Sequence, residues 1–208
     1  LIPDHLSYEE AATLPCAALT AWRALFTDGN LKSGQHVLLE GTGGVSIFGL
    51  QLDAAAGAKP IITSSSDEKL IKARALGAIG TVNYRTNTEW QKTVLELTEG
   101  AGIDHVLDVV GRETLYRAIE TLAYDGHIAL IGALSGRADE LSLGSLPRGT
   151  SMTNIAVGSR DDFIAMNEFL TEHELRPVID RVFSFEEAPA AYEYMDSSAH
   201  LGKIVITL

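Results

Sequence analysis

Short apolar runs alternate with longer amphipathic segments along most of the chain. The apolar runs of strand length lie at residues 36–40, 59–63, 78–83, 103–110 and 126–131. Segments with helical spacing of apolar positions follow them, at residues 45–56, 66–76, 88–97 and 112–122. Strands that are apolar throughout, rather than at alternate positions, belong to a parallel sheet that is buried on both faces. The pattern therefore predicts an α/β fold with a doubly wound parallel sheet.

The two ends of the chain carry further predicted elements. Ser7 begins a capping box before a short helix, and residues 14–26 form a second helix with Pro15 in its first turn. Toward the C-terminus we expect a sixth strand at 153–157, a helix at 160–173, an extended stretch at 177–183, a helix at 188–195 and a strand at 203–208. The last strand has no place in a six-stranded parallel sheet, so we expect it to lie beside another element.

The composition of the chain argues against nucleic-acid binding, a membrane span, an internal disulfide and a metal site. The chain has 208 residues, 46% of them hydrophobic, and a formal net charge of −12, which leaves no basic excess for binding nucleic acid. It has no apolar run of about 18 residues, so no membrane span is predicted. The single cysteine, Cys16, excludes an internal disulfide and favours a cytoplasmic location. The six histidines are scattered without metal-ligand spacing.

A glycine-rich loop, GTGGVS at residues 41–46, connects the first predicted strand to a helix. It matches G-x-G-x-x-G except that Ser46 takes the third glycine position. In a βαβ unit, the backbone N–H groups of Gly43 and Gly44 would approach a pyrophosphate at the helix N-terminus. A tight turn without a ligand is the alternative for such a loop taken alone. We expect the Ser46 side chain to move the helix slightly away from the strand.

The end of the second predicted strand indicates which nucleotide the loop holds. The stretch from Leu39 to Gly44, which contains Glu40, also resembles the acidic glycine loop of S-adenosylmethionine-dependent methyltransferases. Those enzymes usually carry a second carboxylate at the end of the next strand. Ser64, Ser65 and Ser66 stand there instead. An NAD site commonly has Asp or Glu at this point. Its absence, together with Lys69, favours the 2′-phosphate of NADP; alternatively, Ser66 only caps a helix and Lys69 is a surface residue.

Several stretches together resemble the medium-chain dehydrogenase/reductase superfamily, on the side of its zinc-independent, quinone-oxidoreductase-like alcohol dehydrogenases. They are ATLPCAALTAWRALF, GTGGVSIFGLQLDAAAGA, SSSDEKLIKARALGA, VNYR, DHVLDVVG, GHIALIGALSG, VGSR and HLGKIVITL, in that order. The resemblance implies a six-stranded Rossmann domain at residues 15–160, after a junction segment at 1–14. It also implies a helix and a returning segment at 161–208, whose last strand would join the sheet of a GroES-like catalytic domain that precedes residue 1.

The resemblance further implies a set of cofactor-binding residues. They are Thr20, Gly43, Gly44, Val45, Ser64, Ser65, Lys69, Tyr84, Val110, Gly111, Gly132, Ala133, Val157, Gly158 and Ser159. By this resemblance Gly43, Gly44 and Val45 form the pyrophosphate loop, and Ser64, Ser65 and Lys69 form the 2′-phosphate pocket. Tyr84 is an adenosine-side contact, and Val110 and Gly111 lie beside the cofactor. The nicotinamide side has Thr20, Gly132, Ala133, Val157, Gly158 and Ser159. Tyr84 is alternatively an ordinary aromatic at a strand end. No catalytic residue is assigned, and Cys16, a zinc ligand in zinc-dependent relatives, is expected to be a buried packing residue without metal.

The implied function is hydride transfer between NADP(H) and a carbonyl, quinone or activated alkene, with NAD(H) the less favoured cofactor. This chain would be the cofactor-binding portion, inactive by itself because the substrate-facing wall lies elsewhere. A non-catalytic nucleotide-binding or sensor module of the same fold is the alternative. A third possibility is a folded domain without measurable cofactor affinity.

An edge strand indicates a partner. The strand at 153–157 would lie at the open side of the sheet, and an exposed edge invites pairing with another strand. A two-fold homodimer is therefore expected, with Ile155→Lys giving monomers.

Overall fold

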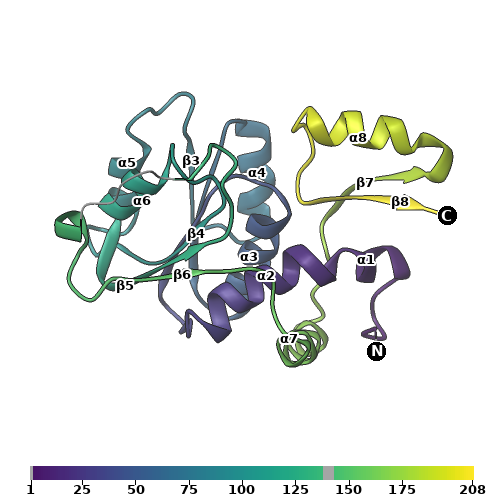
Figure 1. Cartoon of the computed structure of the whole chain (residues 1–208), viewed down its shortest axis with the longest axis horizontal. Coiled ribbons are helices and arrows are strands. Elements are labelled where there is room, and N and C mark those ends of the chain that lie inside the picture. Colours follow the sequence, from purple (N-terminus) through teal and green to yellow (C-terminus); the bar gives the residue numbers. More distant parts are fainter. Residues whose placement is uncertain (1, 138–142) are drawn as a thin grey trace.

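The computed structural model describes residues 2–137 and 143–208 and contains one large parallel sheet (Figure 1). Its strands run in the order β3-β2-β1-β4-β5-β6. They are β1 (His36–Leu39), β2 (Lys59–Ser64), β3 (Gly80–Asn83), β4 (Ile103–Asp108), β5 (Leu122–Leu130) and β6 (Ser151–Asn154). All five pairings are parallel. This order is that of a dinucleotide-binding sheet, so the predicted Rossmann fold is confirmed.

Helices cover both faces of the sheet. They are α2 (Leu19–Trp22), α3 (Gly44–Ala55), α4 (Asp67–Ala75), α5 (Trp90–Leu97), α6 (Leu115–Glu120) and α7 (Arg160–Glu172). A short helix before them, α1 (Tyr8–Ala12), buries no side chain. One core contains side chains of α2, α3, α4 and α7, and a second core contains side chains of α5 and α6. The two cores lie on opposite faces, which is the layering that the doubly wound pattern predicts.

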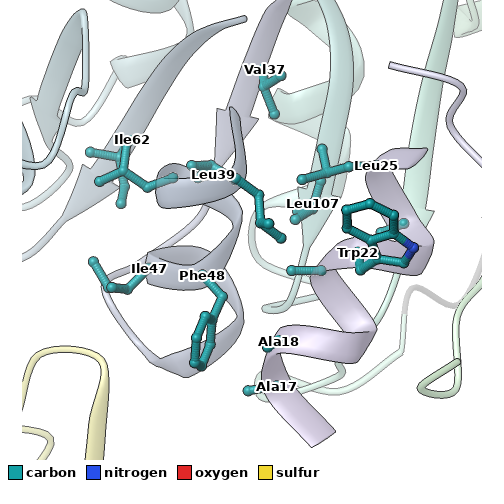
Figure 2. Close-up of a cluster of buried hydrophobic side chains, with 14 of the residues drawn as sticks. Ala17, Ala18, Trp22, Leu25, Val37, Leu39, Ile47, Phe48, Ile62 and Leu107 are labelled. Carbon is teal, nitrogen blue, oxygen red and sulfur yellow. The ribbon is translucent and has the colours of Figure 1, made fainter. Parts of the chain in front are cut away.

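Adjacent residues in the central strands point into different cores. Leu39 belongs to the core under α3, whereas its neighbour Leu38 belongs to the core under α5 and α6. Both are fully buried. Figure 2 shows the first core, in which Leu39 and Leu107 lie between Phe48 of α3 and Trp22 of α2. Because successive side chains of a strand face opposite sides, burial on both faces requires the continuous apolar runs seen in the sequence.

Some element boundaries differ from the prediction. The predicted helix at 14–26 is divided into η1 (Leu14–Ala18), α2 and η2 (Arg23–Thr27), where η1 and η2 have the wider π-helical hydrogen-bonding pattern. The sixth strand begins and ends earlier than predicted, at Ser151–Asn154 rather than 153–157. Val157 has a φ of 65° and is therefore not extended.

The C-terminal segment forms a separate unit, drawn in yellow-green to yellow in Figure 1. Strands β7 (Ile179–Ser184) and β8 (Lys203–Thr207) pair in parallel in a two-stranded sheet of their own. The 3₁₀ turn η4 (Phe185–Glu187) and α8 (Ala188–Asp196) connect them, and a further 3₁₀ turn, η3 (Leu143–Ser145), precedes β6. The expectation that the last strand lies outside the six-stranded sheet is confirmed.

Two of the predicted segments extend beyond the part of the chain that is described. Residue 1 of the junction segment 1–14 and residues 138–142 of the Rossmann domain 15–160 lie outside the described residues. Within residues 2–137 and 143–208, no helix has both the length and the apolar character needed to cross a bilayer.

Candidate functional site

The glycine loop lies where the sheet changes direction of winding. The strand order places β1 beside β4, with the chain leaving these two strands toward opposite sides. Ligands of open α/β sheets bind in the crevice at this point, beyond the carboxyl ends of the strands. After β1 the loop leads directly into α3, whose N-cap is Gly43. The sequence therefore places the N-terminus of a 12-residue helix at this crevice.

The first turn of α3 offers unpaired backbone donors. Its first hydrogen bond within the described structure runs from Ile47 N to Gly43 O at 3.0 Å, so the N–H groups of Gly44, Val45 and Ser46 have no partner inside the helix. No side chain of the described residues caps this end. A β-carbon on Gly43 would meet no atom within 4 Å, so space lies open above the loop. Free N–H groups, open space and a helix dipole together suit a phosphate group.

A cavity of about 620 Å³ opens over this loop. Besides the loop residues, its walls come from the ends of β2 and β4, from α5 and α6 and from the segment before β8. The lining residues are Glu40, Gly41, Thr42, Gly43, Gly44, Val45, Ser46, Thr63, Tyr84, Trp90, Val109, Val110, Glu113, Thr114, Arg117, Leu134, Ser198 and His200. This volume is in the range of cofactor sites. Of the predicted cofactor-binding residues, Gly43, Gly44, Val45, Tyr84 and Val110 line this cavity.

A second, smaller cavity of about 310 Å³ lies at the N-terminus of α4. Ser65 and Lys69, both predicted for the 2′-phosphate pocket, line it together with Lys72 and Arg85. Lys69 Nζ donates a hydrogen bond to the Ser198 carbonyl oxygen at 2.6 Å. Burial lowers the pKa of the Lys69 ammonium, and the charge of Asp180 opposes this effect. The cavity thus has three cationic side chains and one carboxylate, Glu68, in its walls, and the excess of positive charge suits an anionic group.

The segment before β8 lies directly on the glycine loop. Gly202 N donates a hydrogen bond to Thr42 O at 3.0 Å, and Lys203 N donates to Val178 O at 3.0 Å. A β-carbon on Gly44 would come within 2.8 Å of Lys203 Cδ. Sequence reasoning missed Ser198, His200 and Lys203, because nothing in the local pattern indicates that a segment about 160 residues downstream folds back onto the loop.

Two buried carboxyl groups lie beneath the cavity. Glu40 follows β1 and Asp108 ends β4, and they are only 2% and 1% exposed. Burial and then the charge of Asp108 raise the pKa of Glu40 well above its usual value. The Thr114 hydroxyl donates to Glu40 Oε2 at 3.1 Å. In the sequence, Glu40 resembles a methyltransferase-type carboxylate, and no local pattern pairs it with Asp108.

Ser46, at the third glycine position, makes a specific contact. Its hydroxyl donates to the Glu40 carbonyl oxygen at 2.6 Å, and the side chain is only 1% exposed. The hydroxyl therefore joins the start of α3 to the end of β1. The substitution for glycine is accommodated by a hydrogen bond between the helix and the strand.

Other predicted cofactor-binding residues lie outside the two cavities. Ser64 is buried, and its hydroxyl accepts the Ser66 N–H at 3.3 Å. Gly111 has a φ of 92°, and its N–H donates to Asp108 Oδ1 at 2.8 Å. Gly132 packs against the Val109 backbone, and a β-carbon on Gly111 would come within 3.3 Å of Ala133 Cα. The turn after β4 is therefore shaped by Gly111, Gly132 and Ala133, and it carries Val109 and Val110 into the large cavity.

The remaining predicted residues gather at α2 and α7. Thr20 is buried and its hydroxyl donates to the Cys16 carbonyl oxygen at 2.8 Å. Val157 and Gly158 follow β6, and a β-carbon on Gly158 would come within 2.9 Å of Leu19 Cδ1. The Ser159 hydroxyl accepts the Asp162 N–H at 3.1 Å, which caps α7. This group is absent from the walls of both cavities.

Comparison with known proteins decides the family. The sequence profile described as zinc-binding dehydrogenase matches residues 44–172, more than half of the chain. The chain belongs to the zinc-binding dehydrogenase family. The match confirms the resemblance to the medium-chain dehydrogenase/reductase superfamily.

The alignments with relatives of the family extend over almost all of this chain. A zinc-type alcohol dehydrogenase-like protein of Schizosaccharomyces pombe is 44% identical over 99% of this chain and 62% of its own length. The structure of an NAD-dependent alcohol dehydrogenase, 34% identical, has a TM-score of 0.91 over 100% of this chain and 61% of its own. The structure of a quinone oxidoreductase of Pseudomonas syringae pv. Tomato DC3000 is 28% identical in sequence. It has a TM-score of 0.86 over 99% of this chain and 66% of its own length. This chain spans less than two thirds of each.

Zinc, which the family description names, does not fit this part of the protein. Across residues 2–137 and 143–208, no group of three or more His, Cys, Asp or Glu side chains could hold a metal ion. Cys16 is a free thiol, and it is exposed rather than buried as expected. A lone cysteine supplies one ligand of the four that a structural zinc ion needs. By contrast, the open glycine loop and its unpaired N–H groups do fit a nicotinamide dinucleotide, the cofactor class of the family's dehydrogenases.

Proposed function

We propose that this member of the zinc-binding dehydrogenase family is the cofactor-binding portion of an NADP(H)-dependent oxidoreductase. The observation that carries the proposal is the first turn of α3, whose free N–H groups open onto the cavity of about 620 Å³. The cofactor, when bound, supplies a hydride that passes to or from a carbonyl, quinone or activated alkene. Relatives named alcohol dehydrogenase and quinone oxidoreductase support this choice of substrates.

The residues of the glycine loop would hold the pyrophosphate. The N–H groups of Gly44 and Val45 would donate to its oxygen atoms, and the helix dipole would favour its negative charge. Lys203, which lies against Gly44, would bring a compensating cation. Tyr84 and Trp90 line the same cavity and would offer apolar surface to the adenosine. Each of these contacts orients the cofactor, and orientation is the contribution of this portion to hydride transfer.

The preference for NADP rests on the second cavity. Lys69, Lys72 and Arg85 surround it, and positive charge there would stabilise a 2′-phosphate. One carboxylate, Glu68, lines the same cavity beside these three cations, so the balance of charge there stays positive. Asp67 accepts a hydrogen bond from Asn83 Nδ2 at 2.7 Å. Asp67, the first residue of α4, is thereby engaged, and Ser64 and Ser65 stand at the end of β2 and just after it.

We also propose a homodimer formed by pairing of β6 with β6 of a second copy. β6 is the last strand of the six-stranded order, so one of its edges has no strand partner in the described structure. An exposed edge of this kind offers free N–H and C=O groups to another strand. The interface would be centred on Ser151–Asn154.

In the full-length enzyme, the β7–β8 unit would contact a further domain. The relatives are longer than this chain, and β8 pairs only with β7 among the described strands. We propose that residues 1–14 and 161–208 pack against a catalytic domain, and that β8 extends its sheet. The substrate-facing wall of the active site would then lie in that domain.

Calorimetric titration of this chain with NADPH and with NADH tests the cofactor proposal. We expect NADPH to bind at least about tenfold more tightly, since one charge-assisted contact contributes roughly 1–3 kcal/mol. Lys69→Ala should remove this preference and leave NADH binding unchanged. Lys92→Ala, which removes an exposed lysine of α5, is the matched control and should change neither.

The outcomes separate the parts of the proposal. Equal affinity for the two cofactors would refute the 2′-phosphate site but keep the dinucleotide site. No binding of either cofactor would refute both. Binding without turnover of aldehydes, quinones or enones by the protein as the gene encodes it would instead identify a nucleotide sensor.

A further inference from the structure

Glu40 and Asp108 meet at the point where the sheet changes direction of winding. Glu40 directly follows β1, and Asp108 is the last residue of the neighbouring β4. Glu40 leads into the glycine loop, and Asp108 leads into the turn before α6. Glu40 also lines the cavity of about 620 Å³. The two carboxyl groups therefore lie between the two segments that form the floor of the proposed cofactor site.

The hydrogen bonds of the two carboxyl groups indicate which of their oxygen atoms lack a donor. Asp108 Oδ1 accepts the N–H groups of Val110 at 3.1 Å and Gly111 at 2.8 Å, so this oxygen acts as an acceptor. Glu40 Oε2 accepts the Thr114 hydroxyl at 3.1 Å, whereas Glu40 Oε1 has no partner among the described residues. A buried carboxyl group in this position is satisfied if Glu40 carries the proton and donates it to Asp108.

The electrostatics agree with this location of the proton. Burial, then the charge of Asp108, then a hydrogen bond with Asp108 raise the pKa of Glu40. The Thr114 hydroxyl and the Val110 N–H lower it, but the raising effects exceed them. A charged Glu40 would place two negative groups side by side in a buried site, where their repulsion is poorly screened.

We propose that a proton shared by Glu40 and Asp108 fastens the glycine loop to the turn before α6, and that its loss at higher pH weakens dinucleotide binding. This inference rests on the proposed function. With the proton present, β1 and β4 are joined by a hydrogen bond under the cavity. Without it, the two carboxylates repel each other and also repel the pyrophosphate above them, so Glu40 acts as a positioning residue for the cofactor.

Other charged or titratable groups face the same cavity. They are Glu113 and Arg117 beside and in α6, Tyr84 after β3 and His200 before β8. Lys203, whose Cδ lies beside Gly44 of the loop, is a further charged neighbour. Burial and then the charge of Lys69 lower the pKa of His200, so His200 titrates on the acidic side of its usual value. A substitution at Glu40 alone separates its contribution from theirs.

The test is a series of calorimetric titrations with NADH between about pH 5 and about pH 9. NADH lacks the 2′-phosphate, whose own titration would overlap; NADPH replaces it if NADPH alone binds. We expect the wild-type dissociation constant to rise about tenfold across this range, which corresponds to a coupling of one pKa unit. Glu40→Gln should bind with a dissociation constant that changes less than about twofold, because its amide donates to Asp108 at every pH. Glu96→Gln, which removes an exposed carboxyl group on α5, should retain the wild-type profile.

A second variant and a second measurement keep the inference testable. Thr114→Val removes the donor to Glu40 Oε2 and should shift the wild-type profile to higher pH. Urea unfolding without ligand reports the same proton: the free energy of unfolding should fall with rising pH more steeply for wild type than for Glu40→Gln.

Each result decides between the two proposals. If neither cofactor binds at any pH, the proposed function fails, and the unfolding series alone judges the shared proton. Parallel unfolding and binding profiles for wild type and Glu40→Gln would overturn the inference even if cofactor binds tightly. If Glu40→Gln does not fold, Thr114→Val takes its place. A pH profile of cofactor binding for Thr114→Val that is not shifted from the wild-type profile would then overturn the inference.

Discussion

Lys203, in the last strand, lies against Gly44, the first residue of α3, so closely that a β-carbon on Gly44 would come within 2.8 Å of Lys203 Cδ. The backbone holds this contact in place, because Gly202 N donates to Thr42 O and Lys203 N donates to Val178 O. A cation from the C-terminal segment is thereby brought to the helix end that the glycine loop opens. The returning segment consequently completes the proposed cofactor site.

Replacing Lys203 by methionine should weaken both cofactors equally. Methionine keeps an apolar stem against Gly44 but removes the charge, and the pyrophosphate is common to NADH and NADPH. We expect about a tenfold rise in both dissociation constants, within the range of a charge-assisted contact. Calorimetry of Lys203→Met beside Lys69→Ala checks this. A loss confined to NADPH would place Lys203 at the 2′-phosphate instead.

Acid should destabilise the chain through His105. Burial and then the charge of His127 lower the pKa of His105 to about 4, and its Nε2 lies 3.0 Å from Gln35 Oε1. The unfolded state, with an ordinary pKa, takes up a proton first, so stability falls as pH decreases from 6.5 toward 4. The loss reaches about 3 kcal/mol for this residue. Urea unfolding between these pH values should give a shallower loss for His105→Gln, and an equal loss would assign the effect to other groups.

Asp53 should destabilise the protein at neutral pH. It is fully buried in α3, and neither carboxyl oxygen has a hydrogen-bond partner in the described part of the chain. Burial raises its pKa well above the usual value. The folded state therefore retains the proton longer than the unfolded state, and this residue's contribution to stability falls as pH rises above about 4.

The corresponding experiment compares Asp53→Ala with wild type by urea unfolding. The variant should be more stable at neutral pH by about 1–3 kcal/mol, because the unpaired buried group is removed. Its advantage should shrink at acidic pH. Asp161→Ala, at an exposed position of α7, should show no such gain. A wild type that is more stable than Asp53→Ala at neutral pH would contradict this account.

The proposed dimer should depend on Asn154. Ile155 N donates to Leu130 O, so by the alternation of a parallel ladder the Asn154 N–H points to the open edge of β6. Asn154→Pro removes that donor without touching the β5 pairing and should give monomers in sedimentation velocity. Ile155→Lys is the poorer test, because Ile155 is only 6% exposed and belongs to the core. Persistent dimers of Asn154→Pro would locate the interface elsewhere.

The sequence determined the α/β layering and the place of the glycine loop. Leu38 and Leu39 are neighbours buried in different cores, so a strand of this kind must be apolar throughout, and that pattern is visible in the sequence. The loop at 41–46 follows such a strand and opens a helix, so its position at the sheet edge also follows from local pattern. The sequence does not determine element boundaries that depend on a turn, such as the end of β6 before Val157, which has a φ of 65°.

Only the tertiary structure decided which distant residues share the site. Glu40 and Asp108 are 68 positions apart in the printed sequence, and they meet because β1 and β4 are adjacent in the sheet. Lys203 reaches Gly44 because the C-terminal segment returns across the loop. Periodicity and spacing encode contacts within one element, whereas these contacts depend on strand order and on how the segments pack. The sequence thus determined the fold and the loop, and the packing of separate segments determined the charges around it.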